Sequence, residues 1–179
     1  MKVLDIIKDR RSVRDFTDED VSNEEIETVM EAARWAPSWA NTQCWDFVIV
    51  RDNGTKQKLL DAFGPTNPGR KSVEKAPALI VVCGRKKVSG AKGGEYVTTK
   101  GDWLMFDCAL ATQNICLQAH ALGLGTVILG FFDAEMVAKI LEIPEDVEVV
   151  VIVPIGRPAR VPKAPKRREL SEIIHWERY

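Results

Sequence analysis

The sequence has few of the residues that build metal sites or disulfide frameworks. Among its 179 residues are two histidines and four cysteines, and no two cysteines form a C-x-x-C pair. Zinc sites need ligands at close spacing, and disulfide scaffolds need paired cysteines. We therefore expect no metal site and four reduced cysteines. Cys83, Cys108 and Cys116 lie in apolar company and are expected to pack as small hydrophobic side chains.

Neither sign of charge is in excess, and no apolar run is long. The chain has 25 Lys and Arg against 26 Asp and Glu, whereas a protein that coats nucleic acid or an anionic membrane usually carries a strong basic excess. No apolar run approaches the roughly 20 residues of a membrane helix. The first ten residues carry charges every few positions, unlike a signal peptide. We expect a cytoplasmic protein with a small-molecule partner, without nucleic acid or membrane.

Length and composition fit one domain over residues 1–179. Helical spacing of apolar residues predicts a first helix to about Arg10. The capping box Ser22–Glu25 predicts the start of a second helix, which Pro37 ends. Other helices are expected at 56–63, 102–122 and 134–141, and strands at 45–50, 78–83, 127–129 and 147–155.

Two segments have unusual polarity. Residues 102–122 leave little polar face, so this helix should be buried nearly all round. In so small a domain, burial partly against a second subunit is favoured over a fully internal position. Residues 88–100 are polar and contain glycine, which predicts a mobile surface excursion.

Basic side chains and a hydroxyl are concentrated where the first helix ends, at Arg10, Arg11, Ser12 and Arg14. A guanidinium group forks onto phosphate oxygens and keeps its charge, so this cluster suits a phosphorylated cofactor. The alternative is a solvated basic helix end, which the helix dipole also favours.

The order Arg-Arg-Ser-x-Arg-x-Phe, from Arg10 to Phe16, resembles the opening of FMN-dependent nitroreductase-family proteins. Three later segments, 36–45, 123–130 and 154–176, are similar to family segments in the same order, although Cys44 stands where the family usually has proline. The resemblance implies an α+β fold, with a mixed central β-sheet flanked by helices and a domain-intertwined homodimer. It also implies FMN as the cofactor.

The resemblance assigns the arginine cluster to FMN. Arg10 and Ser12 would hold the phosphate and nearby ribityl oxygens, with help from Arg11. Arg14 would approach the N1 and C2 carbonyl edge of the flavin ring, where a fixed cation stabilises the negative charge of the reduced form. Arg157 and Arg168 are candidates for a second phosphate ligand, although the neighbouring Arg167 competes for that role.

Other parts of the cofactor site are implied by the later segments. Pro37, Ser38, Trp39 and Asn41 would reach the flavin from the other protomer, so that dimerisation is required for function. Residues Leu129 and Gly130 belong to the segment beside the flavin ring. The backbone N–H of Gly130 is the expected donor to N5, where a side chain would crowd the ring.

The implied activity is hydride transfer from NAD(P)H through flavin N5 to an electron-poor nitroaromatic or quinone, by a ping-pong mechanism. The flavin carries the chemistry, so we expect no catalytic side chain. Reductive dehalogenation and flavin fragmentation occur in the same fold family and remain open. So do a non-catalytic FMN carrier and a basic interaction module for an acidic partner, using Arg10–Arg14 and Lys163–Arg168.

Overall fold

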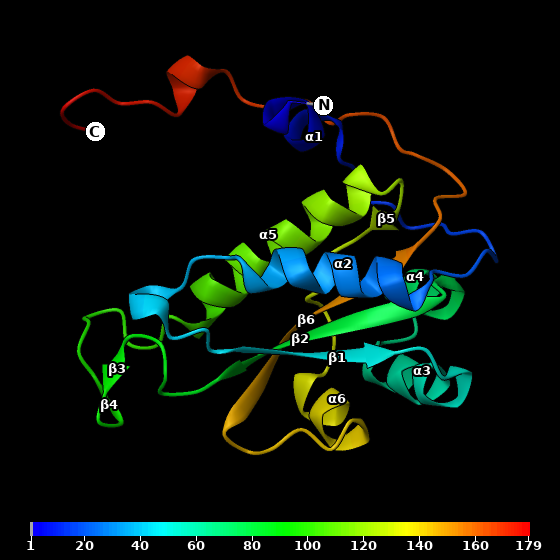
Figure 1. Cartoon of the computed structure of the whole chain (residues 1–179), viewed down its shortest axis with the longest axis horizontal. Coiled ribbons are helices and arrows are strands. Elements are labelled where there is room, and N and C mark those ends of the chain that lie inside the picture. Colours follow the sequence, from blue (N-terminus) through cyan, green and yellow to red (C-terminus); the bar gives the residue numbers. More distant parts are fainter. Residues whose placement is uncertain (1) are drawn as a thin grey trace.

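A computed structural model describes residues 2–179. Its centre is a four-stranded sheet in the order β1-β2-β6-β5 (Figure 1). The strands are β1 Trp45–Val50, β2 Ala78–Arg85, β5 Gly125–Thr126 and β6 Val147–Gly156. Each strand pairs antiparallel with its neighbour. Beyond β5, Ser12 forms a parallel bridge to Thr126, and this bridge makes the sheet mixed.

The central strand β2 is buried from Ala78 to Gly84. It faces β1 at Val48↔Val81 and β6 at Val81↔Ile152. Branched apolar side chains fit a strand that is covered on both faces. The continuous apolar run in the sequence is explained by this position.

Helices cover both faces of the sheet (Figure 1). Helices α2 (Asn23–Arg34) and α5 (Leu104–Ala121) share one hydrophobic core with the sheet. Helices α3 (Asn53–Leu59), α4 (Arg70–Lys75) and α6 (Ala134–Ile140) contribute to a second core on the opposite face. These layers confirm the predicted α+β class with a sheet flanked by helices.

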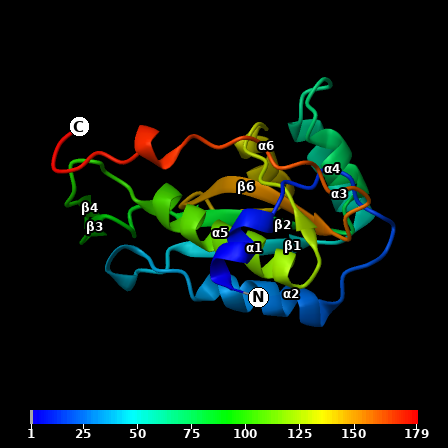
Figure 2. The same cartoon turned by 90° about the horizontal axis from the view of Figure 1, so that it is seen from above.

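The remaining elements lie around this body. Helix α1 (Val3–Asp9) has no buried residue and lies beside α5 (Figure 2). The segment predicted as a surface excursion contains a small hairpin of β3 (Ala91–Lys92) and β4 (Glu95–Tyr96). Short 3-10 turns occupy Trp39–Asn41, Leu60–Ala62 and Leu170–Glu172. None of the helices in residues 2–179 combines the length and apolar character needed to cross a membrane.

Several predicted boundaries are confirmed and others move. The strand at 45–50 and the Ser22–Glu25 capping box are found as predicted. The helix expected from residue 56 begins at Asn53, because the Asp52 carboxylate caps it by accepting from the Thr55 N–H at 2.6 Å. The strand expected at 127–129 is wrong. The strand is Gly125–Thr126, and Leu129 makes an isolated bridge to Ile152.

Helix α5 is less enclosed within one chain than its composition predicts. Eight of its residues are buried, but Met105 and Phe106 at its start are 54% and 55% exposed. Apolar side chains with this exposure in adjacent positions form a patch that a single chain does not cover.

A close approach at Gly125 positions residues 10–17, which carry Arg10, Arg11 and Arg14 and are termed the arginine segment. The Val13 N–H donates to the Thr126 carbonyl at 2.9 Å, and the Val13 side chain lies over Gly125. A Cβ added at Gly125 would stand 2.7 Å from the Val13 Cβ, which is inside the contact distance of carbon atoms. Glycine is therefore required here for space.

We predict that Gly125→Ala lowers the free energy of unfolding by about 1–3 kcal/mol, because the arginine segment must move away from β5. Urea denaturation measures the change. Gly64→Ala is the matched control, since an added Cβ there meets no atom within 4 Å. Equal stability of the two variants would contradict the spatial role of Gly125.

Candidate functional site

The backbone of the arginine segment is fixed on both sides. Its inner side bonds to β5 through the Val13 N–H. Its outer side bonds to the chain that follows β6, where the Thr17 N–H donates to the Arg157 carbonyl and the Ala159 N–H donates to the Asp15 carbonyl, each at 3.0 Å. The buried Ser72 hydroxyl also donates to the Arg14 carbonyl at 3.1 Å. The side chains between these anchors therefore start from a rigid backbone.

A cavity of about 290 Å³ lies against this segment. Its lining residues come from the arginine segment and from the C-terminal tail, and they are Arg10, Arg11, Ser12, Arg14, Pro162, Lys163, Pro165 and Arg167. Five of the eight are cationic and none is acidic. None of these five side chains takes part in an ion pair within residues 2–179. Like charges held together without counter-charges favour the binding of an anion.

The arginine side chains retain free donors in this arrangement. Arg11 Nη1 donates to the carbonyls of Lys8 and Arg10, at 2.5 and 2.8 Å. Arg14 Nη1 makes a longer bond of 3.3 Å to the Ser12 carbonyl. A guanidinium group has five N–H donors in a planar fork, so each side chain has several left for a phosphate or a carbonyl ligand.

Arg157 lies outside this cavity. Its Nε donates to Glu19 Oε1 at 2.9 Å, and its Nη2 donates to Glu25 Oε1 at 2.7 Å. These hydrogen bonds, with that of Glu25 the larger, raise the pKa of Arg157. The side chain thereby joins the end of the sheet to the start of α2. The Arg157 side chain therefore stabilises the fold through its ion pairs, and it does not lie with the other predicted phosphate ligands.

In the C-terminal tail, Arg167 lies at the cavity, whereas Arg168 was the candidate predicted from the sequence. Arg168 donates to the Glu172 carbonyl and does not line the cavity, whereas Arg167 and Lys163 do. Adjacent residues of an extended chain point in different directions. The sequence Lys166-Arg167-Arg168 alone therefore does not predict which of its side chains faces the cavity.

The Pro37–Asn41 segment lies at the other end of the molecule. It follows α2 and forms a tight turn in which Ala40, Asn41 and Gln43 all have positive φ, at 47°, 57° and 50°. The Ser38 hydroxyl accepts from the Gln43 N–H at 2.9 Å. Non-glycine residues adopt this left-handed backbone rarely, so the surrounding contacts must hold the turn.

Helix α5 separates the two predicted parts of the site. The Trp39 N–H bonds to Asp107 in the first turns of α5, while Ser12 is bridged to Thr126, just beyond its last turn. An α-helix rises 1.5 Å per residue, so the 18 residues of α5 span about 25 Å. Figures 1 and 2 both place the two segments at opposite ends. One chain therefore does not bring them together.

The third predicted segment, at Leu129 and Gly130, forms an ordered loop. Leu129 exchanges two backbone bonds with Ile152, at 2.9 and 3.0 Å. The Asn67 side-chain amide donates to the Phe131 carbonyl on the other side of Gly130. A Cβ added at Gly130 would meet no atom within 4 Å, so the space beside its backbone is open. Gly130 is exposed in the single chain.

The cysteines behave as predicted. All four are free and buried. Burial raises the pKa of the Cys83 thiol to about 11, and burial also raises the pKa of Cys116. Both thiols are therefore protonated at neutral pH and are poor nucleophiles.

Asp107 is a residue that the sequence reasoning missed. It is fully buried in α5, where its carboxylate accepts from Trp39 and from the Ser89 hydroxyl. The available signal was a single acidic residue within a helix that otherwise leaves little polar face. Charged side chains are seldom fully buried unless their hydrogen bonds are satisfied.

The layered α+β fold and the cation-lined cavity define a protein with a candidate anion site. Residues 7–157 match the model of the Nitroreductase family, and the chain belongs to this family. A Methanothermobacter thermautotrophicus protein, provisionally named NADH dehydrogenase/NAD(P)H nitroreductase, is 34% identical over 185 residues, with 100% of this chain and 88% of the relative covered.

Two further comparisons concern flavin proteins. FMN reductase (NAD(P)H) of Bacillus subtilis is 27% identical over 189 residues, which cover 99% of this chain and 74% of the relative. A provisionally named nitroreductase from Desulfovibrio desulfuricans, solved in complex with FMN, superposes with a TM-score of 0.80 at 30% identity. That match covers 100% of this chain and 98% of the other.

The ion pair between Arg157 and Glu25 makes the free energy of unfolding depend on pH. The Ser22 backbone N–H, and secondarily Arg157, hold the pKa of Glu25 below its ordinary value of 4.5. A carboxyl group with a lowered folded-state pKa stabilises the fold above its unfolded pKa and loses this effect as the pH falls through the folded value. We expect Glu25→Gln to cost about 1 kcal/mol near pH 7 and progressively less below pH 4.5.

Urea unfolding of both proteins between pH 7 and pH 3 measures this difference. Glu27→Gln, at an exposed position of the same helix, is the control and should change the free energy of unfolding little. A Glu25→Gln deficit that stays constant over the whole pH range would refute the ionised role of Glu25.

Proposed function

We propose that this chain is an FMN-dependent NAD(P)H oxidoreductase that works as a homodimer, with its FMN sites at the subunit interface. The observation that carries this proposal is the cavity lined by five cations without an ion-pair partner in residues 2–179. Membership of the Nitroreductase family and the FMN complex of the Desulfovibrio protein support the choice of FMN as the anion.

The donor set fits the phosphate end of FMN. Arg10, Arg11 and the Ser12 hydroxyl line the cavity from one side, and Lys163 and Arg167 line it from the other. Charge-assisted hydrogen bonds to phosphate are the strongest that such side chains make. In the proposal these five hold the phosphate and nearby ribityl oxygens, and Arg14 lies toward the pyrimidine edge of the ring.

The length of α5 supports the homodimer of this proposal. A two-fold axis that crosses this helix would bring the Pro37–Asn41 segment of each chain to the arginine segment of its partner. The assembly would contain two equal sites. The ring end of each flavin would then meet Ser38, Trp39 and Asn41 from the second subunit.

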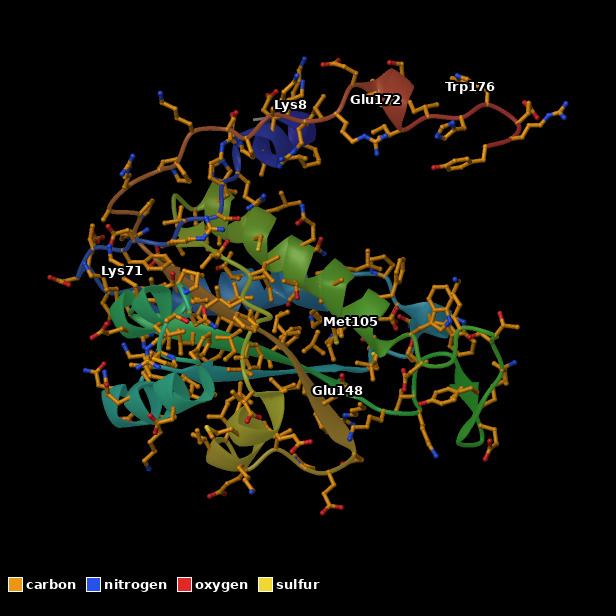
Figure 3. The ribbon with its side chains drawn as sticks, turned by 180° about the vertical axis from the view of Figure 1, so that it is seen from behind. Lys8, Lys71, Met105, Glu148, Glu172 and Trp176 are labelled. Carbon is orange, nitrogen blue, oxygen red and sulfur yellow. The ribbon has the colours of Figure 1, made fainter. Side chains whose placement is uncertain are left out.

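Exposed apolar surface supports the same assembly. On α1 the side chains of Val3, Leu4 and Ile7 are exposed, as are Met105 and Phe106 at the start of α5. The tail carries exposed Ile173, Ile174 and Trp176 away from the body of the chain (Figure 3). Apolar patches and an uncovered apolar arm favour burial against a second copy.

FMN, when bound, would supply the redox chemistry: hydride acceptance from NAD(P)H at N5 and, in a ping-pong sequence, transfer of the electrons to a nitroaromatic or quinone. The protein contributes position and charge. Arg14 places a permanent cation near the edge where reduction adds negative charge. Gly130 is exposed and has open space at its Cβ position, so in the proposal its backbone N–H would donate to N5 without a side chain crowding the ring.

The absorption spectrum of the purified protein and the mass of its released cofactor test this function. We expect a yellow protein that releases FMN and is bleached saturably by NADH or NADPH in stopped-flow experiments. Subsequent addition of a quinone or nitroaromatic should restore the oxidised spectrum. A colourless protein that takes up no FMN would exclude the proposal, and bound FMN without saturable bleaching would indicate a carrier.

The tail arginines provide a matched pair of variants. Arg167→Ala should raise the dissociation constant of FMN about 10- to 100-fold, because it removes a charge-assisted contact with the phosphate. Arg168→Ala removes the same charge from the chain but not from the cavity, so its effect should stay below about three-fold. Fluorescence titration of FMN measures both constants. A larger effect of Arg168→Ala would reverse the assignment.

Arg14 should act on the redox potential more than on retention. We expect Arg14→Ala to lower the two-electron potential of bound FMN by on the order of 30 mV, which corresponds to about 1.4 kcal/mol of lost stabilisation of the reduced ring. Spectroelectrochemical titration measures the potential. Arg10→Ala is the comparison variant, expected to weaken FMN binding instead. Equal potentials for the wild type and Arg14→Ala would refute the role of Arg14.

A further inference from the structure

Asp107 is a fully buried carboxylate surrounded by neutral donors. The Trp39 N–H donates to Oδ1 at 3.1 Å and to Oδ2 at 3.2 Å, and the Ser89 hydroxyl donates to Oδ2 at 2.6 Å. No ion pair in residues 2–179 involves Asp107. A buried polar group is costly unless its hydrogen bonds are made, and the bonds of Asp107 come from residues outside its own helix.

Cys44 adds a third donor to the same carboxylate. Its Sγ lies 3.7 Å from Asp107 Oδ2, and the residue is buried. This is the position where the sequence departs from the proline that is usual in the family. A proline has neither a thiol nor an N–H and could not donate here. The departure at Cys44 therefore has a structural partner in Asp107.

The carboxylate connects two loops to the start of α5. Trp39 belongs to the turn after α2, and Ser89 precedes the β3–β4 hairpin. Trp39 lies beside Ala40 and Asn41, whose positive φ values are uncommon for residues with side chains. Such conformations persist where the surrounding structure over-determines them. Two backbone bonds lie within the turn, from the Asn41 N–H to the Ser38 carbonyl and from the Thr42 N–H to the Trp39 carbonyl, each at 3.0 Å, and the Gln43 N–H bonds to Ser38 Oγ. The bond from the Trp39 N–H to Asp107 is the contact that ties the turn to α5.

We propose that Asp107 is a positioning residue for the cofactor site: through the Trp39 N–H it fixes the Pro37–Asn41 segment in the conformation that meets the flavin of the partner subunit. Asp107 itself is buried behind the turn and does not touch the cofactor. The Ser89 hydroxyl and the Cys44 thiol both donate to Oδ2 of Asp107 and hold the carboxylate in place. This inference rests on the proposed function for its link to FMN, but the control of the turn is independent of it.

The test variant is Asp107→Asn, which keeps the size of the side chain but puts an NH₂ donor among donors. We expect backbone hydrogen exchange at residues 38–43 of the FMN-free protein to accelerate at least about ten-fold. The asparagine keeps a single acceptor oxygen, which the donors of Trp39, Ser89 and Cys44 must share, while its NH₂ group faces one of them unpaired. We also expect the dissociation constant of FMN to rise about 10- to 100-fold. The visible circular dichroism of bound FMN should change, since the surroundings of its ring change.

Asp102→Asn is the matched control. Asp102 is also an acidic acceptor at the start of α5, where it accepts from the N–H groups of Lys87 and Leu104 and from the Tyr96 hydroxyl. It makes no bond to the Pro37–Asn41 segment. Its substitution should leave exchange at 38–43 unchanged and alter the FMN dissociation constant by less than about three-fold.

Ser89→Ala keeps the carboxylate and serves if Asp107→Asn does not fold. It removes one supporting donor and should shift exchange and FMN binding in the same direction by a smaller factor. Unchanged exchange at 38–43 in a folded Asp107→Asn protein, or in Ser89→Ala if that is the folded variant, would overturn the inference. An equal effect of Asp102→Asn would also overturn it. If the wild type binds no FMN but exchange responds as expected, the proposed function fails while Asp107's control of the turn stands.

Discussion

The length of α5 is the constraint on which the rest of the functional arrangement depends. The helix packs along one face of the sheet, so its two ends are fixed by the core and cannot approach each other. The arginine segment is attached near one end through β5, and the Pro37–Asn41 segment is attached near the other through Asp107. The first attachment is made by backbone hydrogen bonds, and the second by a bond from the Trp39 N–H to the Asp107 side chain. The chain thus holds the two candidate half-sites at opposite ends of α5.

Electrostatics separates the arginine that is paired within the fold from those that line the cavity. Arg157 is matched by Glu19 and Glu25 and fastens α2 to the end of β6. The cations around the cavity have no such partners among the ion pairs of the described residues, although the chain as a whole is nearly neutral. Because side-chain charge alone is the same in both groups, the difference lies in where the carboxylates are placed.

Local signals predicted most of the strands and helices. The capping box at Ser22, the strand at 45–50 and the apolar run of β2 were readable because side-chain spacing reports directly on local backbone structure. Helix α4 was not predicted, since it follows a loop rich in proline and glycine. The strand at Gly125–Thr126 is two residues long and depends on its pairing with β6, which no local pattern reveals.

The lining of the cavity was predictable from the sequence in part: Arg10, Arg11, Ser12 and Arg14 line it as a group, whereas the contribution of the tail was not predicted residue by residue. The cluster Arg10–Arg14 and the later family-like segments indicated an anion site with contributions from both ends of the chain. The position of Arg167 at the cavity and of Arg157 outside it depends on the path of the tail and on the position of two glutamates, which are tertiary properties. The turn at Ala40 and Asn41 was not foreseen, because neither residue type favours positive φ as glycine does.

The separation of the two half-sites couples the cofactor to the oligomeric state. In the proposed dimer each flavin touches both subunits, so cofactor binding and subunit association become linked equilibria. Whatever factor the second subunit adds to the affinity for FMN, FMN adds the same factor to the affinity between subunits. A cell that runs short of flavin would therefore hold more of this protein as separate chains, with the apolar surfaces of α1, α5 and the tail uncovered.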